Sequence, residues 1–179
     1  GHVITKTAGR TKTIWFSAPL SAGFTIAGTI TPNVRGLESA TAANAGFQYQ
    51  IMRWSVLRGG IVSSIGQSAD DAFTEWGTSE AARTTPTMTP TSTAVVPGDR
   101  LVFIIYNDDG ATVAETASGR SMTIFYDGAT GATGDTYFTF TENLTFSADS
   151  NNAPARPATL WFLSDPIVYA MKFFEGIFA

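Results

Sequence analysis

The side chains that could carry acid–base or metal chemistry in this chain are few. His2 is the only histidine among the 179 residues, and cysteine is absent. A Ser-His-Asp arrangement, a multi-histidine metal site and a cysteine nucleophile therefore lack the residues that they need. His2 also lies beside the first residue, in a segment that we expect to be frayed, so we expect no catalytic role for it.

Carboxylate pairs are the remaining route to catalysis, because two Asp or Glu side chains suffice to cleave a glycosidic bond. The adjacent pairs Asp70-Asp71 and Asp108-Asp109 suit this poorly, since neighbouring strand residues point to opposite faces. Asp108-Asp109 is followed by Gly110, which is typical of a turn. Residues 127–135 offer two carboxylates to Ca²⁺, but without the spacing of a calcium loop, and a hairpin connection explains them better. The sequence predicts no enzyme, no metal site and no cofactor.

Two tryptophans could instead form a platform on which a sugar ring stacks. Trp76 is a better candidate than Trp54, because it lies in the irregular segment Phe-Thr-Glu-Trp-Gly. Large aromatic side chains mostly bury their surface, so packing in the core is the competing interpretation of both residues. Trp76 is the one residue for which we predict a glycan contact.

The C-terminus holds the largest concentration of apolar side chains. Fourteen of the twenty residues from Leu160 to Ala179 are apolar. The largest exposed apolar patch on a typical monomer is about 300–600 Å², so this segment must be buried, in its own domain or in a neighbouring subunit. We predict that its large side chains form a subunit interface: Leu160, Trp161, Phe162, Leu163, Ile167, Val168, Tyr169, Met171, Phe173, Phe174, Ile177 and Phe178.

This C-terminal arm, residues 159–179, is not expected to span a membrane. Ser164-Asp165-Pro166 interrupts it after four apolar residues, and Lys172 and Glu175 interrupt the remainder. A span needs about 20 predominantly apolar residues. Asp165-Pro166 is instead a helix-start signal, and it predicts a short helix, apolar on all sides, over residues 167–175. Residues 159–163 resemble a strand that could complete the domain's own sheet, whereas the helix is expected to insert into a partner.

The composition of the rest of the chain is typical of an all-β protein. There are 26 Thr and 17 Gly against three Lys, and Thr is favoured on half-exposed strand faces. The net charge of −4 and the scattered arginines provide no basic surface for nucleic acid.

The pattern of apolar residues predicts the strands that must position these side chains. We expect strands at residues 11–16, 24–31, 47–54, 61–68, 101–106, 121–126 and 136–146. Gly59-Gly60 predicts a hairpin, and the uninterrupted apolar run 101–106 predicts a strand covered on both faces.

Three segments between these strands are less regular. Pro32 is expected to end the strand 24–31 or to place its end at an edge. Residues 37–46 are expected to form a loop, and residues 84–93 an edge strand or an ordered crossing loop. The fold prediction is a jelly-roll-like antiparallel β-sandwich at residues 11–146, with an N-terminal segment 1–10, a linker 147–158 and the arm 159–179.

The body resembles a family of structural proteins from the virions of tailed bacteriophages. Four stretches carry the resemblance: residues 11–23 leading into 26–30, residues 36–40 leading into 45–47, the Pro-Gly-Asp-Arg-Leu-Val of residues 97–102, and residues 125–128 running to 140–146. The resemblance implies a noncatalytic virion component, and it supplies no active-site residues.

The function expected from these observations is that of a virion structural protein, either a capsid decoration or a minor tail component. Its partners would be copies of itself and other virion proteins, and it would be assembled in the bacterial cytoplasm. One alternative is a carbohydrate-binding domain of a phage receptor-binding spike, in which Trp76 contacts a host glycan. Another is an extracellular filament subunit whose arm adds a strand to the next subunit.

Overall fold

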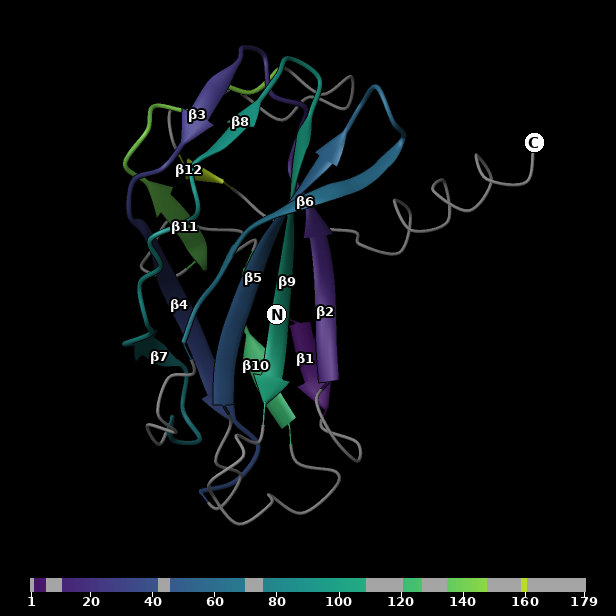
Figure 1. Ribbon diagram of the computed structural model, residues 1–179. Coiled ribbons are helices and arrows are strands. Elements are labelled where there is room, and N and C mark those ends of the chain that lie inside the picture. Colours follow the sequence, from purple (N-terminus) through teal and green to yellow (C-terminus); the bar gives the residue numbers. More distant parts are fainter. Residues whose placement is uncertain are drawn as a thin grey trace, which may run out of the picture.

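The computed structural model describes residues 2–5, 11–41, 46–69, 76–108, 121–126, 135–147 and 159–160 (Figure 1). Within these ranges every regular element is a strand, which confirms the all-β prediction. The strands are β1 (His2–Thr5), β2 (Thr11–Phe16), β3 (Phe24–Ile26), β4 (Ile30–Glu38), β5 (Gly46–Ser55), β6 (Gly60–Gln67), β7 (Ala81–Arg83), β8 (Thr93–Val95), β9 (Arg100–Asp108), β10 (Ser121–Ile124), β11 (Tyr137–Phe140) and β12 (Thr159–Leu160).

Two antiparallel sheets form the sandwich. The four-stranded sheet has the order β2-β9-β5-β6, and the six-stranded sheet contains the row β1-β10-β4-β7 together with β11 and β12. The rows β2-β9-β5-β6 and β1-β10-β4-β7 hold eight strands. When these eight are counted from 1 to 8 along the chain, the first row has the order 2-7-4-5 and the second has the order 1-8-3-6. This interleaving is that of a jelly roll, so the predicted fold class is confirmed.

The strand predicted at residues 136–146 is regular only over β11, and it continues β10 along the same edge of β4. β10 pairs with residues 36–38 of β4, and β11 pairs with residues 30–33, both antiparallel. Between them the Phe125 N–H donates to the Arg35 carbonyl over 2.9 Å, and the Thr136 N–H donates to the Phe125 carbonyl over 2.9 Å. Because β1 pairs with β10 and β12 pairs with β11, both terminal strands lie on the far edge of this split strand.

The predicted strand 24–31 is in fact two strands, β3 and β4, separated by residues 27–29. The Glu142 carboxylate causes the break, because its Oε1 accepts hydrogen bonds from the N–H groups of Ala27 (2.7 Å) and Gly28 (2.6 Å). A Cβ at Gly28 would lie 2.6 Å from the Thr141 Cβ, so only glycine fits this close approach.

Pro32 was expected to end a strand or to place its end at an edge. It lies instead inside β4. Its backbone faces the edge of β4 that carries the crossing segment, residues 84–92. There Ile30 exchanges two backbone hydrogen bonds with Met88, and the Thr85 hydroxyl donates to the Pro32 carbonyl over 3.5 Å. On this side β4 has no continuous row of strand-to-strand hydrogen bonds at Pro32. The missing N–H of the proline therefore leaves no carbonyl of a neighbouring strand without its donor.

The predicted loop 37–46 is shorter than expected, because β4 continues to Glu38 and β5 begins at Gly46. Leu37 and Glu38 pair with β10 instead. Residues 84–92 form a crossing segment, the second of the two predicted alternatives. Besides its bridge to Ile30 in the six-stranded sheet, its Thr91 N–H donates to the Ile65 carbonyl in the four-stranded sheet over 3.0 Å.

The core lies between the sheets, and aromatic rings fill its centre. The Phe138 ring of β11 lies 4.9 Å from the Phe103 ring and 5.0 Å from the Tyr49 ring, which both come from the opposite sheet. Burial of Tyr49 raises the pKa of its phenol, whose O–H donates to the Ile30 carbonyl over 3.3 Å. Every residue from Leu101 to Tyr106 is buried, which confirms that β9 is covered on both faces.

Candidate functional site

The predicted subunit interface falls almost entirely outside the described residues. Of the twelve side chains assigned to it, only Leu160 belongs to a described element, and the other eleven lie in residues 161–179, as does the predicted helix 167–175. Leu160 stands opposite Phe138 and Thr159 stands opposite Thr139, so β12 extends the six-stranded sheet of its own domain. The arm therefore leaves the described part of the chain at an edge of this sheet.

Part of the outer face of the four-stranded sheet is apolar. Alternate residues of β9, namely Val102, Ile104 and Tyr106, form a second hydrophobic cluster on the side away from the core. Phe16 of β2 and Met52 and Trp54 of β5 pack against this cluster and remain partly exposed.

Exposed apolar side chains gather at one end of this sheet. The described residues include seven large apolar side chains that are exposed, and five of them lie on the β5–β6 hairpin or the adjacent β8–β9 turn: Val56, Leu57, Ile61, Val62 and Val96. We call these five residues the hairpin patch. Leu57, at the tip of the hairpin, is 85% exposed. Figure 1 shows the hairpin projecting from the sandwich at the upper right of the view.

Asp99 holds the base of the hairpin patch in place. Its side chain is 0% exposed and accepts three hydrogen bonds: from Arg53 Nε at 2.6 Å, from the Val56 N–H at 3.2 Å and from the Val96 N–H at 3.0 Å. These bonds satisfy a buried carboxylate and join the hairpin to the β8–β9 turn. The hairpin patch is therefore anchored to the sandwich.

Trp76 is not the exposed platform predicted for a glycan. It is 1% exposed and lies beneath the six-stranded sheet, with its ring 5.8 Å from the Phe47 ring. The Arg83 guanidinium lies over the ring, with its Cζ 5.8 Å from the ring centroid, in a cation–π contact. Neither ring face is available to a sugar, and the competing interpretation, packing in the core, is confirmed.

A pocket of about 320 Å³ lies between β4, β7 and the start of β11. Asn33, Arg35, Arg83, Asp135 and Tyr137 supply its polar groups. Sequence reasoning missed this pocket because its lining comes from three segments that are far apart in the chain. Only Asp135 was considered, as part of the weak calcium pattern, and that pattern predicts neither arginine.

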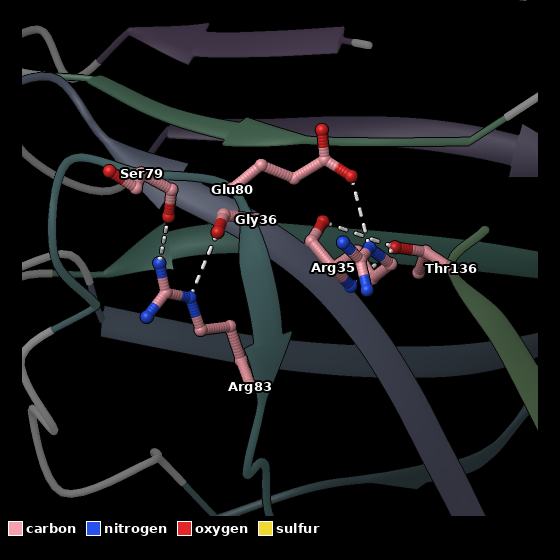
Figure 2. Close-up of polar contacts among 6 residues, drawn as sticks. All are labelled: Arg35, Gly36, Ser79, Glu80, Arg83 and Thr136. Atoms are coloured by element: carbon pink, nitrogen blue, oxygen red, sulfur yellow. Dashed lines mark hydrogen bonds and ion pairs between the residues drawn. The ribbon is translucent and has the colours of Figure 1, made fainter. Parts of the chain in front are cut away.

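Hydrogen bonds fix both arginines of the pocket (Figure 2). Arg35 Nε donates to Glu80 Oε1 over 3.0 Å, and the Arg35 N–H donates to the Thr136 hydroxyl over 3.0 Å. Arg83 Nε donates to the Gly36 carbonyl over 2.8 Å, and Arg83 Nη2 donates to the Ser79 carbonyl over 2.7 Å. The two guanidinium groups are thus held in position by β4 and by the segment that precedes β7.

The remaining candidates for chemistry are not brought together. His2 lies in β1 and pairs through its backbone with Ile124 of β10, so this part of the expected frayed terminus is a strand. Asp108 ends β9, whereas Asp109, the pair Asp70-Asp71 and Asp127 lie outside the described residues. Among the described residues, no three His, Asp or Glu side chains are grouped as metal ligands would be. The same residues contain no helix with the length and apolarity of a membrane span.

Searches of protein-family models, of curated proteins and of solved structures each found no match to this chain. The likeness to phage structural proteins therefore rests on the four sequence stretches alone.

Proposed function

We propose that this chain is a noncatalytic structural protein of a virion, a capsid decoration or minor tail component, which assembles in several copies through its C-terminal arm. One observation carries the proposal: a hairpin patch of five exposed apolar residues occurs on a chain whose arm, residues 159–179, is itself rich in apolar side chains. Several exposed apolar side chains on one projecting hairpin and the turn beside it are typical of a site of contact with another protein. The arm of one copy is the proposed partner of the hairpin patch of the next.

The geometry of the two sheets supports contact between copies. The arm departs from an edge of the six-stranded sheet, beside β11. The hairpin patch belongs to the opposite, four-stranded sheet. An arm and a receiving surface on different sheets allow a reciprocal exchange between two copies or a head-to-tail contact that continues into a ring or filament.

A second candidate is the filament subunit that uses strand addition. It is favoured by β12, because Thr159 and Leu160 pair with β11 as an edge strand. In this version the same two residues pair with β11 of a neighbouring copy, and main-chain hydrogen bonds provide the affinity.

The assembly proposal is tested by shortening the chain and by changing the hairpin patch. We expect deletion of residues 161–179, and separately Leu57→Glu, to reduce the assembled mass measured by light scattering on a sizing column. Val3→Glu is the matched control, because Val3 is exposed but lies on β1, away from the hairpin patch. Circular dichroism should show the same β content in all three variants.

Two outcomes would contradict the proposal. One is an unchanged assembled mass for both the deletion and Leu57→Glu. The other is equal loss of assembly in Val3→Glu, because the contact would then not depend on the hairpin patch. The virion assignment has its own measurement: quantitative mass spectrometry of purified phage particles should find the full-length chain in many copies and the deleted chain at lower occupancy.

A further inference from the structure

We propose that the pocket beside Arg35 and Arg83 binds one ring of a neutral sugar. None of the residues that line this pocket belongs to the arm or to the hairpin patch, and the inference does not depend on the assembly proposal. It also differs from the glycan contact predicted at Trp76, because Trp76 is buried and does not line the pocket.

The polar groups of the pocket suit hydroxyl groups. Arg35 offers guanidinium donors, Asn33 an amide with both donor and acceptor atoms, Asp135 a carboxylate that accepts, and Tyr137 a phenol that does both. Each sugar hydroxyl also donates and accepts. A pocket that mixes donors with acceptors can satisfy several adjacent hydroxyls at once, whereas a pocket of donors alone would select an anion.

The charges of the pocket favour a neutral ligand. The Arg35 guanidinium is paired with the Glu80 carboxylate, and the Asp135 carboxylate also lines the pocket, whereas the Arg83 guanidinium donates to the carbonyls of Gly36 and Ser79. Glu80 forms an ion pair with Arg35 at 3.0 Å, which offsets the charge of that guanidinium at the rim of the pocket. A phosphate, sulfate or carboxylate ligand would have to approach these acidic groups without a net positive field to attract it.

The size and apolar surface of the pocket fit one pyranose ring. Its volume of about 320 Å³ lies at the lower end of the ~300–1,000 Å³ of small-molecule sites. Ala82 and the Tyr137 ring contribute apolar surface beside the polar groups. The C–H face of a sugar packs against an aromatic ring, while its hydroxyls reach the polar groups around it.

The pocket is organised before a ligand enters. Nε of Arg35 and both Nε and Nη2 of Arg83 already have partners at 2.7–3.0 Å. Figure 2 shows that the Arg35 guanidinium lies beside Glu80 and Thr136, whereas the Arg83 guanidinium points the other way, toward Ser79 and Gly36. Side chains that are already fixed lose little conformational entropy on binding. A weak but specific interaction is expected, with a dissociation constant on the order of millimolar for a single ring.

The test uses the full-length chain and defined probes. Saturation-transfer NMR would be run with the methyl glycosides of glucose, galactose, mannose, rhamnose and N-acetylglucosamine, and with N-acetylneuraminic acid and glucose 6-sulfate as anionic probes. We expect at least one neutral glycoside to bind. Tyr137→Ala and Asp135→Asn should each weaken its affinity by about tenfold or more, and Tyr137→Phe should retain most of it because the ring remains.

The matched control for the pocket arginine is Arg58→Ala, compared with Arg35→Ala. Arg58 is exposed in the turn of the β5–β6 hairpin, far along the chain from every residue of the pocket. Only Arg35→Ala should lose binding. If Arg35→Ala does not fold, Asp135→Asn decides in its place.

Three results would overturn the proposal. The first is that no neutral glycoside binds, and the second is that only the anionic probes bind. The third is binding that Tyr137→Ala and Asp135→Asn leave unchanged. Leu57→Glu separates this inference from the assembly proposal, because it should reduce the assembled mass and leave the glycoside signal intact.

Discussion

The two sheets of the sandwich share one core, but their outer faces differ in polarity. In β4 of the six-stranded sheet, buried residues alternate with partly exposed ones such as Asn33 and Arg35, and a polar pocket forms there. In β9 of the four-stranded sheet the alternate positions are also apolar, and exposed apolar residues continue onto the hairpin. The outer face of one sheet thus carries a polar pocket, and the outer face of the other carries an apolar cluster.

The ion pairs of the two sheets differ in how far their carboxylates are exposed to solvent. Arg53–Asp99 joins a fully buried carboxylate to the base of the hairpin patch, whereas the Glu80 carboxylate of Arg35–Glu80 is exposed. An exposed pair contributes little because water and salt screen it, but removing one partner of a buried pair leaves polar groups without compensation.

The largest expected effect follows from this contrast. We expect Asp99→Ala to lower the free energy of unfolding by about 3–5 kcal/mol, because Arg53 and two backbone N–H groups lose their acceptor. Glu80→Ala should lower it by about 0–1 kcal/mol. Urea unfolding followed by tryptophan fluorescence measures both, and losses of similar size would show that the two ion pairs are equivalent after all.

A smaller difference in stability is expected when alanine replaces one glycine in each sheet. At Gly36 of β4 a Cβ would lie 2.5 Å from Trp76 Cζ3 and 2.8 Å from the Thr123 carbonyl oxygen. At Gly66 of β6 it would lie 2.6 Å from the sulfur of Met88, a side chain that can move. Gly36→Ala should therefore cost about 1–3 kcal/mol of stability, and Gly66→Ala clearly less.

Thermal unfolding of the two glycine variants, side by side, is the measurement. A lower melting temperature for Gly66→Ala than for Gly36→Ala would mean that the four-stranded sheet is the more tightly packed of the two at these positions.

The smallest expected effect is the pH dependence that Glu142 contributes to the six-stranded sheet. Burial of Glu142 acts to raise its pKa, but hydrogen bonds from the Ala27 and Gly28 N–H groups outweigh it and hold the pKa below the ordinary value. A lowered carboxyl pKa contributes stability that is present above the ordinary pKa and is lost as the pH falls through the lowered one.

The wild-type chain should therefore lose slightly more stability on acidification than Glu142→Gln does. Chemical unfolding of both proteins at a series of acidic pH values would detect the difference. Parallel curves would show that these two hydrogen bonds do not depend on the charge of Glu142.

Much of the four-stranded sheet could be predicted from local sequence. β2, β5, β6 and β9 lie where apolar alternation, the Gly59-Gly60 hairpin signal and the run 101–106 placed them. The six-stranded sheet was harder, because long-range contacts decide its elements. Glu142 separates β3 from β4, and the crossing segment accommodates Pro32 inside a strand. Neither partner is near in sequence.

The candidate sites show the same division. The apolar character of the arm is plain in the sequence, but the hairpin patch was not predicted, because exposure depends on what packs over a residue. Trp76 was singled out as an exposed aromatic, yet Arg83 and Phe47 enclose it. The polar pocket had no local signal, since Arg35, Arg83 and Asp135 meet only when β4, β7 and the start of β11 lie side by side.

Composition and periodicity were enough to establish an all-β chain with a strand apolar on both faces and an apolar C-terminal arm. These properties follow from the side chains of adjacent residues, because alternation along a strand decides which face is apolar. The folded chain alone assigned Trp76 to the core, joined β10 and β11 along one edge of β4 and assembled the pocket around Arg35. Each of these depends on contacts between residues far apart in sequence, which the pairing of strands creates.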